Sequence, residues 1–348
     1  MKRYRLALVG LGNVSRNLIR ILLERGSSLE EKHEVCFSIV AISEKMGAVI
    51  ASDKEHGLNS EELARILSDP DKLTTIRGYI DGCKAIEMIP KCGADILIEL
   101  TPTDIQTGEP ALSHMLQAFA CQMHVVTANK GPLITAWQEL KQAAYNSKRQ
   151  LKFGCATAAA LPTTNVGYYD LAGSEILSLE GVLNGTSNYL LTRMQEDGLA
   201  YEKALIEAQQ MGIAEKDPSL DVNGYDTAVK LVILANELLS LNVKLQDVPI
   251  EGISLLSEIA IKEAKALGKV YKLVGSAKKD PMDGSYSLEV GLKLLDVDHP
   301  LASVRGTAKA LTFKTDLLGT FFISGGNSDP KAAAAAILRD LINLVREE

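Results

Sequence analysis

The chain has 348 residues, of which 46% are hydrophobic and 23% are charged, and its formal net charge is −7. This composition is that of a globular protein with a full core, and it excludes disordered, collagen-like and disulfide-framework proteins. The negative charge is offset by no block of Lys or Arg, which argues against nucleic acid as a ligand. The length predicts two domains.

The five cysteines are scattered and form no CxxC pair, so we predict neither a zinc site nor a redox pair. Their number and spacing suit a reducing cytoplasm. A basic N-terminus precedes an apolar stretch at residues 6–9, which is too short for a signal peptide. The longest uncharged run, residues 153–169, contains Pro162 as well as Thr and Asn, so no membrane span is expected.

The first half of the chain alternates strand and helix patterns, which is typical of a parallel sheet with right-handed crossovers. Strands are predicted at residues 6–9, 35–42, 95–100 and 124–127, and a helix at 111–119. A helix after the first strand is expected to end at Gly26. Residues 45–92 are expected to hold helices and one strand.

After residue 150 the pattern changes to that of an α+β domain. A stretch rich in small residues, 154–164, marks the change. Strands are predicted at 176–182, 271–277 and 285–295, and helices at 201–211, 225–241, 254–266 and 330–345. Asp283-Gly284 is predicted to be the turn between the last two strands.

A glycine turn stands directly between the first strand and the first helix. Gly10 and Gly12 match the first two glycines of the dinucleotide-binding pattern G-x-G-x-x-G, and the small Ser15 takes the third position. Gly10 permits the tight turn, and Gly12 lets the backbone approach a pyrophosphate at the start of the helix. The fold class predicted is therefore α/β, with a Rossmann-type doubly wound parallel sheet and a second, α+β domain. A glycine-bearing turn without a ligand is the alternative.

The end of the second strand bears on the choice of cofactor. An acid there accepts hydrogen bonds from the ribose 2′-OH of NAD, whereas a base suits the 2′-phosphate of NADP. Glu44 and Lys45 stand side by side, so NAD and NADP both remain open. A solvated turn without a cofactor role is a third interpretation.

Two lysines are candidates for a site. Asp226 and Lys230 lie four residues apart on one face of a predicted helix that continues apolar. Such a pair is either a structural ion pair or a functional site. Lys130 follows a predicted strand, at the end where open parallel sheets bind ligands, and Thr101 holds an equivalent place after another strand. A surface-loop lysine is the alternative for Lys130.

Five motifs together resemble the homoserine dehydrogenase family, in its short form without a kinase or a C-terminal regulatory domain. They occur in the family's order and cover nearly the whole chain. The motifs are residues 10–14, 99–103, 127–132, 184–189 and 215–230. The glycine turn is shared with many families, whereas the Asn-Gly-Thr run at 184–186 and the block at 215–230 are specific to this one.

The resemblance implies reversible, NAD- or NADP-dependent interconversion of L-homoserine and L-aspartate 4-semialdehyde by hydride transfer, in threonine and methionine biosynthesis. It implies that Lys230 is the catalytic lysine and that Lys130 is a second active-site lysine beside the nicotinamide. The implied substrate-binding residues are Glu215, Asp226, Asp221, Thr186 and Gly185. The implied cofactor-binding residues are Gly10, Gly12, Asn13, Val14, Thr101, Lys130 and Gly326.

The residue types suit this chemistry. Carboxylates such as that of Glu215 can hold the ammonium of homoserine by charge-assisted hydrogen bonds. Oxidation of the hydroxyl releases a proton, which a lysine can accept if its pKa lies below the usual value of about 10.4. Burial and a second lysine nearby both lower the pKa of a lysine. Our hypothesis is that Lys230 relays the proton and Lys130 aids positioning and charge.

The resemblance also implies a discontinuous domain arrangement and a cytoplasmic homodimer. Residues 1–150 with 317–348 are expected to form the NAD(P)-binding domain, and residues 151–316 the substrate-binding and dimerisation domain. The length leaves no room for an appended kinase or amino-acid-sensing domain, so we expect no threonine feedback through one.

Two positions depart from the family's pattern. Many members carry a Glu before the small-residue stretch, where it helps hold a monovalent cation; residues 153–162 contain no acid, and we predict no metal. Cys155 in this stretch is predicted to be a small buried residue and not a nucleophile. Ile213 stands where members usually have Tyr.

Two other functions remain as alternatives. A related dehydrogenase acting on an aspartate-derived substrate is one; a semialdehyde dehydrogenase would need an activated Cys with a His partner, which the five histidines do not provide. A dinucleotide-sensing regulatory module is the other. It would explain the glycine turn but not the block at 215–230.

Overall fold

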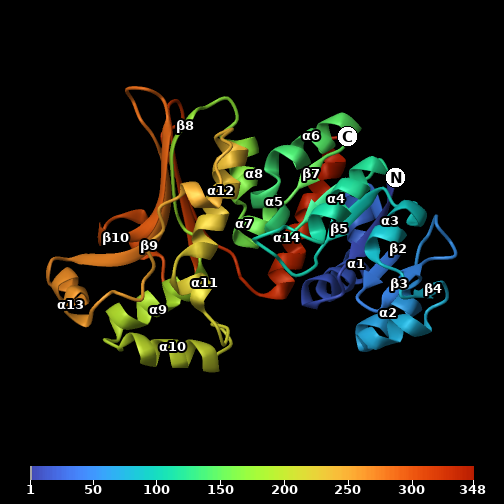
Figure 1. Cartoon of the computed structure of the whole chain (residues 1–348), viewed down its shortest axis with the longest axis horizontal. Helices are drawn as coiled ribbons and strands as arrows, with labels where there is room; N and C mark the ends of the chain where they lie inside the picture. The colour runs from blue at the N-terminus through green and yellow to red at the C-terminus, as the bar shows by residue number, and fades with distance from the viewer. Residues whose placement is uncertain (1) are drawn as a thin grey trace. The chain divides into compact units, whose positions relative to one another are not determined.

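The computed structural model describes residues 2–348, which divide into two compact units (Figure 1). One unit consists of residues 2–156 together with 329–348, and the other of residues 157–328. The chain therefore returns to the first unit at residue 329 and not at 317. Residues 317–328 stay with the second unit because they include a strand of its sheet.

The first unit is built on a seven-stranded sheet with the strand order β4-β3-β2-β1-β5-β6-β7. The strands are β1 (Lys2–Val9), β2 (Val35–Glu44), β3 (Gly47–Ile50), β4 (Tyr79–Asp81), β5 (Ile96–Glu99), β6 (His124–Thr127) and β7 (Leu151–Lys152). The pairs β2–β1, β1–β5, β5–β6 and β6–β7 are parallel. Beyond β2, the pairs β2–β3 and β3–β4 are antiparallel. The strand order switches direction between β1 and β5, which is where open α/β sheets bind ligands.

Helices cover this sheet on both faces. They are α1 (Asn13–His33), α2 (Ser60–Ser68), α3 (Ala85–Cys92), α4 (Ala111–Ala120), α5 (Gly131–Thr135), α6 (Trp137–Ser147) and α14 (Pro330–Arg346), with the 3-10 helix η1 (Pro70–Thr75). Leu6 and Leu8 of β1 pack in one core with Ile337 of α14. Ala7 and Leu97, which point to the other face, are equally buried. The predicted doubly wound α/β fold is therefore confirmed.

Two local predictions for this unit are wrong. Helix α1 continues through Gly26 to His33 and ends at Glu34, whose φ of 55° is left-handed. A glycine inside a helix costs about 1 kcal/mol, and burial of Leu29 in the core offsets that cost. Residues 45–92 hold two strands, β3 and β4, where one was predicted.

The second unit has a five-stranded antiparallel sheet with the order β10-β9-β8-β11-β12. The strands are β8 (Ile176–Val182), β9 (Lys269–Lys279), β10 (Tyr286–Asp296), β11 (Lys309–Thr315) and β12 (Thr320–Gly325). This α+β architecture confirms the second part of the predicted fold class.

Most helices of the second unit are short. They are α8 (Thr163–Asn165), the π-helical turn η2 (Val166–Asp170), α9 (Gly185–Glu196), α10 (Tyr201–Gln210), α11 (Ser219–Val222), α12 (Tyr225–Leu238), η3 (Leu245–Asp247), α13 (Glu258–Ala266) and η4 (Pro300–Ser303). Helix α7 (Gly154–Ala158) straddles the boundary between the units. Between residues 2 and 348, no helix is long and apolar enough to cross a bilayer.

Helix α12 lies close to β9 because Gly275 has no side chain. A Cβ atom on Gly275 would stand 3.1 Å from Cγ2 of Thr227. The close packing fixes α12 on the sheet, and the first two turns of the helix carry Asp226 and Lys230, the acidic and basic side chains of the candidate site.

Candidate active site

The glycine turn between β1 and α1 has the geometry that a dinucleotide needs. Gly10 has a φ of 90°, and a Cβ there would stand 2.8 Å from the carbonyl oxygen of Leu100, so only glycine fits. Gly12 precedes α1, and a Cβ there would meet no atom of the described chain within 4 Å. Ser15 is buried, and its hydroxyl donates to the Gly10 carbonyl at 2.5 Å. The turn is thus rigid at Gly10 and open to a phosphate at Gly12.

Glu44 at the end of β2 faces this turn. Its Oε2 accepts a hydrogen bond from the backbone N–H of Leu11 at 2.8 Å. From the sequence, Glu44 and Lys45 could each determine the choice between NAD and NADP. In the structure, Glu44 is the one that contacts the glycine turn.

The loops that follow β5 and β6 are joined at the carboxyl edge of the parallel sheet. Glu99 is fully buried, and its carboxylate accepts from His114 at 2.8 Å and from the backbone N–H of Thr101 at 2.8 Å. The side-chain amide of Asn129 donates to the Thr101 carbonyl at 3.1 Å. Lys130 follows as the residue that caps α5. Thr101 and Lys130 are therefore held in one loop cluster, as their positions after neighbouring strands predicted.

The second unit brings four polar side chains together. Lys230 Nζ donates to Oδ2 of Asp226 at 2.5 Å and to the carbonyl of Leu183 at 2.8 Å. The side-chain amide of Asn184 donates to that same Oδ2 at 2.8 Å and to Oδ1 of Asp221 at 2.6 Å. The Lys230 and Asp226 side chains are only 10% and 13% exposed. They form a largely buried cluster in which both charged side chains keep a small exposed fraction.

Local structure explains this convergence. Asp226 and Lys230 lie one helical turn apart in α12, which follows Gly224. Gly185 begins α9, and a Cβ on it would stand 3.0 Å from the Thr307 carbonyl oxygen. The Thr186 hydroxyl donates to the carbonyl of Ile213 at 3.1 Å, which ties the start of α9 to the segment before Glu215.

Two predicted site residues lie apart from these hydrogen-bonded groups. Glu215 is exposed, and within residues 2–348 its carboxylate makes no hydrogen bond or ion pair. Gly326 has a φ of 74°, and a Cβ there would stand 2.8 Å from the backbone nitrogen of Leu161. Gly326 thus packs within the second unit, on the small-residue stretch.

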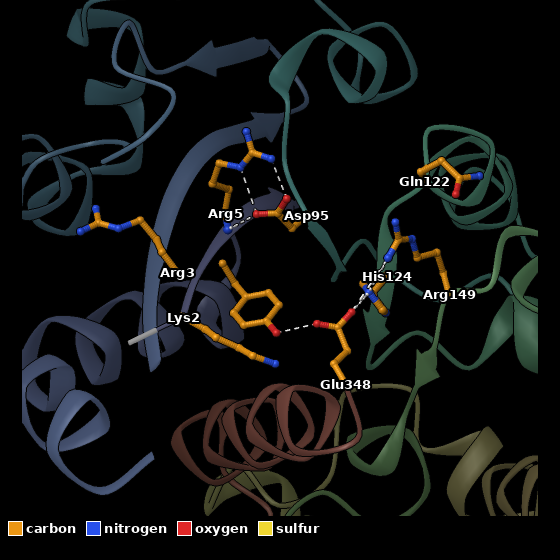
Figure 2. Close-up of a pocket in the computed structure, with 9 residues that line it drawn as sticks. Lys2, Arg3, Arg5, Asp95, Gln122, His124, Arg149 and Glu348 are labelled. Atoms are coloured by element: carbon orange, nitrogen blue, oxygen red, sulfur yellow. Dashed lines mark hydrogen bonds and ion pairs between the residues drawn. The ribbon is translucent and has the colours of Figure 1, made fainter. Parts of the chain in front are cut away.

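A cavity of about 490 Å³ lies at the opposite, amino ends of the parallel strands (Figure 2). Its charged groups bind one another: Arg5 donates to both oxygens of Asp95, and Glu348 accepts from Tyr4 and from His124. Burial lowers the pKa of His124 below its ordinary value. These contacts fasten the end of α14 to the sheet, at the edge opposite the strand ends where open α/β sheets bind ligands.

Sequence reasoning missed Asn184, although a signal for part of its role was present. An Asn at a strand end, followed by Gly-Thr-Ser, is typical of a helix N-cap. The structure confirms that cap, because Asn184 Oδ1 accepts from the backbone N–H of Ser187 at 2.9 Å. Its bridging of two acids is a long-range contact without a local signal. Within the described chain, no group of three or more His, Cys, Asp or Glu side chains is placed to hold a metal ion.

Comparison with known proteins places the chain in a family. The family model described as homoserine dehydrogenase matches residues 162–342. A homoserine dehydrogenase of Methanocaldococcus jannaschii is 37% identical, over 97% of this chain and 97% of that protein. An NAD(+)-dependent homoserine dehydrogenase of Pseudomonas canavaninivorans is 38% identical, over 99% and 97%.

A solved structure supports the same relationship. The crystal structure of a homoserine dehydrogenase from Thermoplasma acidophilum has a TM-score of 0.81 and 25% identity, and the match covers 99% of this chain and 100% of that one. Sequence and structure therefore agree, and this chain belongs to the homoserine dehydrogenase family of NAD(P)-dependent oxidoreductases.

Proposed function

We propose that this chain interconverts L-homoserine and L-aspartate 4-semialdehyde with NAD(P). The observation that carries the proposal is the buried cluster of Lys230, Asp226, Asp221 and Asn184 in a member of this family. An ammonium-bearing substrate suits carboxylates, and oxidation of its hydroxyl requires a proton acceptor.

Lys230 is assigned as the proton relay. In the oxidation direction its neutral amine takes the proton of the homoserine hydroxyl as the C–H electron pair leaves as hydride, and in reduction the ammonium returns it. The Leu183 carbonyl and the Asp226 carboxylate accept hydrogen bonds from Nζ, and these two contacts fix the position of the amine. Lys130, at the start of α5, is assigned as the second active-site lysine.

The substrate groups are assigned to the residues around this cluster. Glu215 is exposed and bound to no other side chain in the described chain, so its carboxylate is available to hold the substrate ammonium. Asp221 and Asp226 are assigned to the same polar end of the substrate. Gly185 and Thr186 would contact it at the start of α9, where the backbone turn is fixed by the Thr186 hydroxyl.

The cofactor is assigned to the first unit. Gly10, Gly12, Asn13 and Val14 at the start of α1 would hold the pyrophosphate, and Thr101 and Lys130 the nicotinamide end. Gly326 is assigned to the nicotinamide by family resemblance alone. When bound, the nicotinamide accepts hydride in oxidation and donates it in reduction.

Between the two cofactors, we propose NAD. The support is the carboxylate of Glu44 against the glycine turn, where it can accept from a ribose 2′-OH and would repel a 2′-phosphate. The relative from Pseudomonas canavaninivorans is named for its NAD(+) dependence.

The setting of the enzyme is also inferred. We propose that residues 2–156 with 329–348 bind the cofactor, and that residues 157–328 bind substrate and pair with a second copy in a homodimer. We place the enzyme in the cytoplasm, in threonine and methionine biosynthesis, with a small molecule and not nucleic acid as its ligand. The net charge of −7 supports the last point.

The test is an assay of NAD(P)H absorbance with L-homoserine. The wild-type chain should reduce NAD, and Lys230→Met should lower kcat by at least about a thousandfold, since a general base contributes about 10²–10⁴-fold to a rate. Lys203→Met, the same change at an exposed site of α10, is the matched control. Failure of the wild type with both cofactors, in protein that binds them, would favour a sensing module instead.

A further inference from the structure

Asn184 has a fixed orientation at the junction of β8 and α9. It is buried, and its Oδ1 accepts from the backbone N–H of Ser187 at 2.9 Å and from the Ser187 hydroxyl at 3.1 Å. Because the oxygen of the amide is committed to the helix start, the nitrogen must point the other way. The orientation of this side chain is therefore set by the helix that it caps.

The two N–H bonds of the Asn184 amide are shared between two carboxylates. One oxygen of Asp221 lies 2.6 Å from the amide nitrogen and one oxygen of Asp226 lies 2.8 Å from it. The Asp226 oxygen is the same atom that accepts from Lys230 Nζ at 2.5 Å. One neutral side chain thus connects α11, α12 and the start of α9.

Two carboxylates so close to one nitrogen repel each other. In such a pair, one group takes up a proton or the two move apart unless donors compensate the charge. Lys230 donates to an oxygen of Asp226, whereas Asn184 donates to both acids. Within the described chain, the carboxylate of Asp221 accepts from no donor other than this amide, so its place in the cluster depends on Asn184.

We propose that Asn184 is a positioning residue of the catalytic cluster, which holds Asp221 beside Asp226 and thereby controls the proton shared by Asp226 and Lys230. This inference rests on the proposed function for its kinetic consequence. It assigns Asn184 a role in the reaction in addition to its role as a helix cap.

The substitution Asn184→Asp separates the two roles. Asp caps a helix as well as Asn does and has nearly the same shape, but it has no N–H to donate and adds a third negative charge. If Asn184 served only as a helix cap, this variant should have normal activity. Positioning predicts that kcat/KM for homoserine falls about a hundredfold or more and that the acid limb of the pH profile moves about one pH unit upward, because the added charge stabilises the ammonium of Lys230.

Asn59→Asp is the matched control. Asn59 caps α2 in the first unit, where its Oδ1 accepts from the backbone N–H of Glu62 at 2.9 Å. The variant should keep wild-type kcat/KM and pH dependence. Asn184→Ser is the second variant; it keeps a capping oxygen without the charge, and it should lose rate without the upward shift of the acid limb.

The result that overturns the inference is an Asn184→Asp or Asn184→Ser enzyme with the wild-type kcat/KM and pH profile. A wild-type chain that does not oxidise homoserine would overturn the proposed function alone. In that case, carboxyl carbon NMR of the full chain, with ¹³C-labelled Asp, tests the positioning directly. The titration midpoint of Asp221 or Asp226 should move by about one pH unit in Asn184→Ser. Titration curves that superimpose on those of the wild type would refute the positioning role of Asn184.

Discussion

At the scale of single residues, the proposed preference for NAD depends on the carboxylate of Glu44. It is exposed, yet its Oε2 is anchored on the backbone N–H of Leu11 within the glycine turn. The neighbouring Lys45 is exposed as well, so the order of charges along the sequence does not decide which group a ribose would meet. The hydrogen bond places the acid at the turn, and this supports the proposed preference for NAD.

Glu44→Ser should raise the ratio of kcat/KM with NADP to kcat/KM with NAD by about tenfold. Two negative groups 4 Å apart repel by about 1 kcal/mol in water and by more near a protein surface, and about 1.4 kcal/mol is a factor of ten. The measurement is initial rates with each cofactor at saturating homoserine. Glu24→Ser, at an exposed site of α1, should leave the ratio unchanged. An unchanged ratio in Glu44→Ser would remove the support for NAD.

At the scale of elements, the start of α12 decides where the acidic and basic groups of the site stand. Gly224 precedes the helix with a φ of 86°, and a Cβ there would lie 3.1 Å from Cγ2 of Ile250. Asp226 follows two residues later, in the first turn of the helix. The direction of α12, and with it the place of Lys230, depends on a turn that only glycine makes without strain.

Gly224→Ala should lower the free energy of unfolding by about 2–5 kcal/mol and lower kcat as well. The left-handed backbone costs about 1–2 kcal/mol with a Cβ, and crowding adds about 1–3 kcal/mol. Urea denaturation and steady-state rates measure the two effects.

Gly198→Ala supplies the comparison for Gly224→Ala. Gly198 has a φ of 66°, but a Cβ there would meet no described atom within 4 Å. Gly198→Ala should therefore lose only the free energy that the left-handed backbone costs, and it should keep its activity. Equal losses in the two variants would mean that the space around Gly224 is unimportant.

Elements with strong periodicity could be predicted from the sequence almost to the residue. Strand β8 has the predicted bounds, and the Asp226–Lys230 pair followed from helical spacing alone. Helix α9 was not predicted, because it begins with polar and small residues and its buried face is largely polar. The predicted helix end at Gly26 was wrong because the packing of Leu29 in the core outweighs the local preference of glycine for a helix end.

Contacts between distant segments could not be predicted. Strand β12 was assigned to the wrong unit because its partner, β11, was not recognised as a strand. The partners of Asn184 lie 37 and 42 residues away in sequence, so no local pattern indicates them. The motifs therefore indicated the residues that we propose as catalytic, whereas the geometry indicated Asn184, which connects them.

At the scale of the whole molecule, α14 completes the first unit. Ile337 and Leu341 are fully buried in the same core as α1. Between them lies Asp340, which is 2% exposed; burial is the main cause that raises its pKa to about 6. Its Oδ1 lies 2.7 Å from where a Cβ of Gly154 would be, and its Oδ2 has no hydrogen-bond partner in the described chain. A buried acid thus marks the place where α14 meets the end of the first segment.

Asp340→Asn should stabilise the protein at neutral pH and not in acid. The folded carboxyl binds its proton up to a pH of about 6, whereas the unfolded one loses it above about 3.8, so wild-type stability falls as the pH rises through this window. The free energy of unfolding of the variant should equal that of the wild type near pH 4. Above pH 6.5 it should be higher by up to about 3 kcal/mol.

Chemical denaturation of both proteins at several pH values measures the gain from Asp340→Asn. The lowered pKa of His124 makes the stability of both proteins fall in acid. The difference in stability between the variant and the wild type at each pH therefore reports on Asp340 alone. A gain that is independent of pH would show that Asp340 is ionised in the folded state throughout the range.

The late return of the chain to its first unit has a consequence for synthesis on the ribosome. The segment up to residue 156 emerges first, but its core lacks Ile337 and Leu341 until residues 157–328 have also been made. At about 5–20 residues per second, the incomplete unit waits roughly 10–40 s with part of its apolar surface uncovered. During that interval the second unit, which is continuous in sequence, can fold before the first unit is complete.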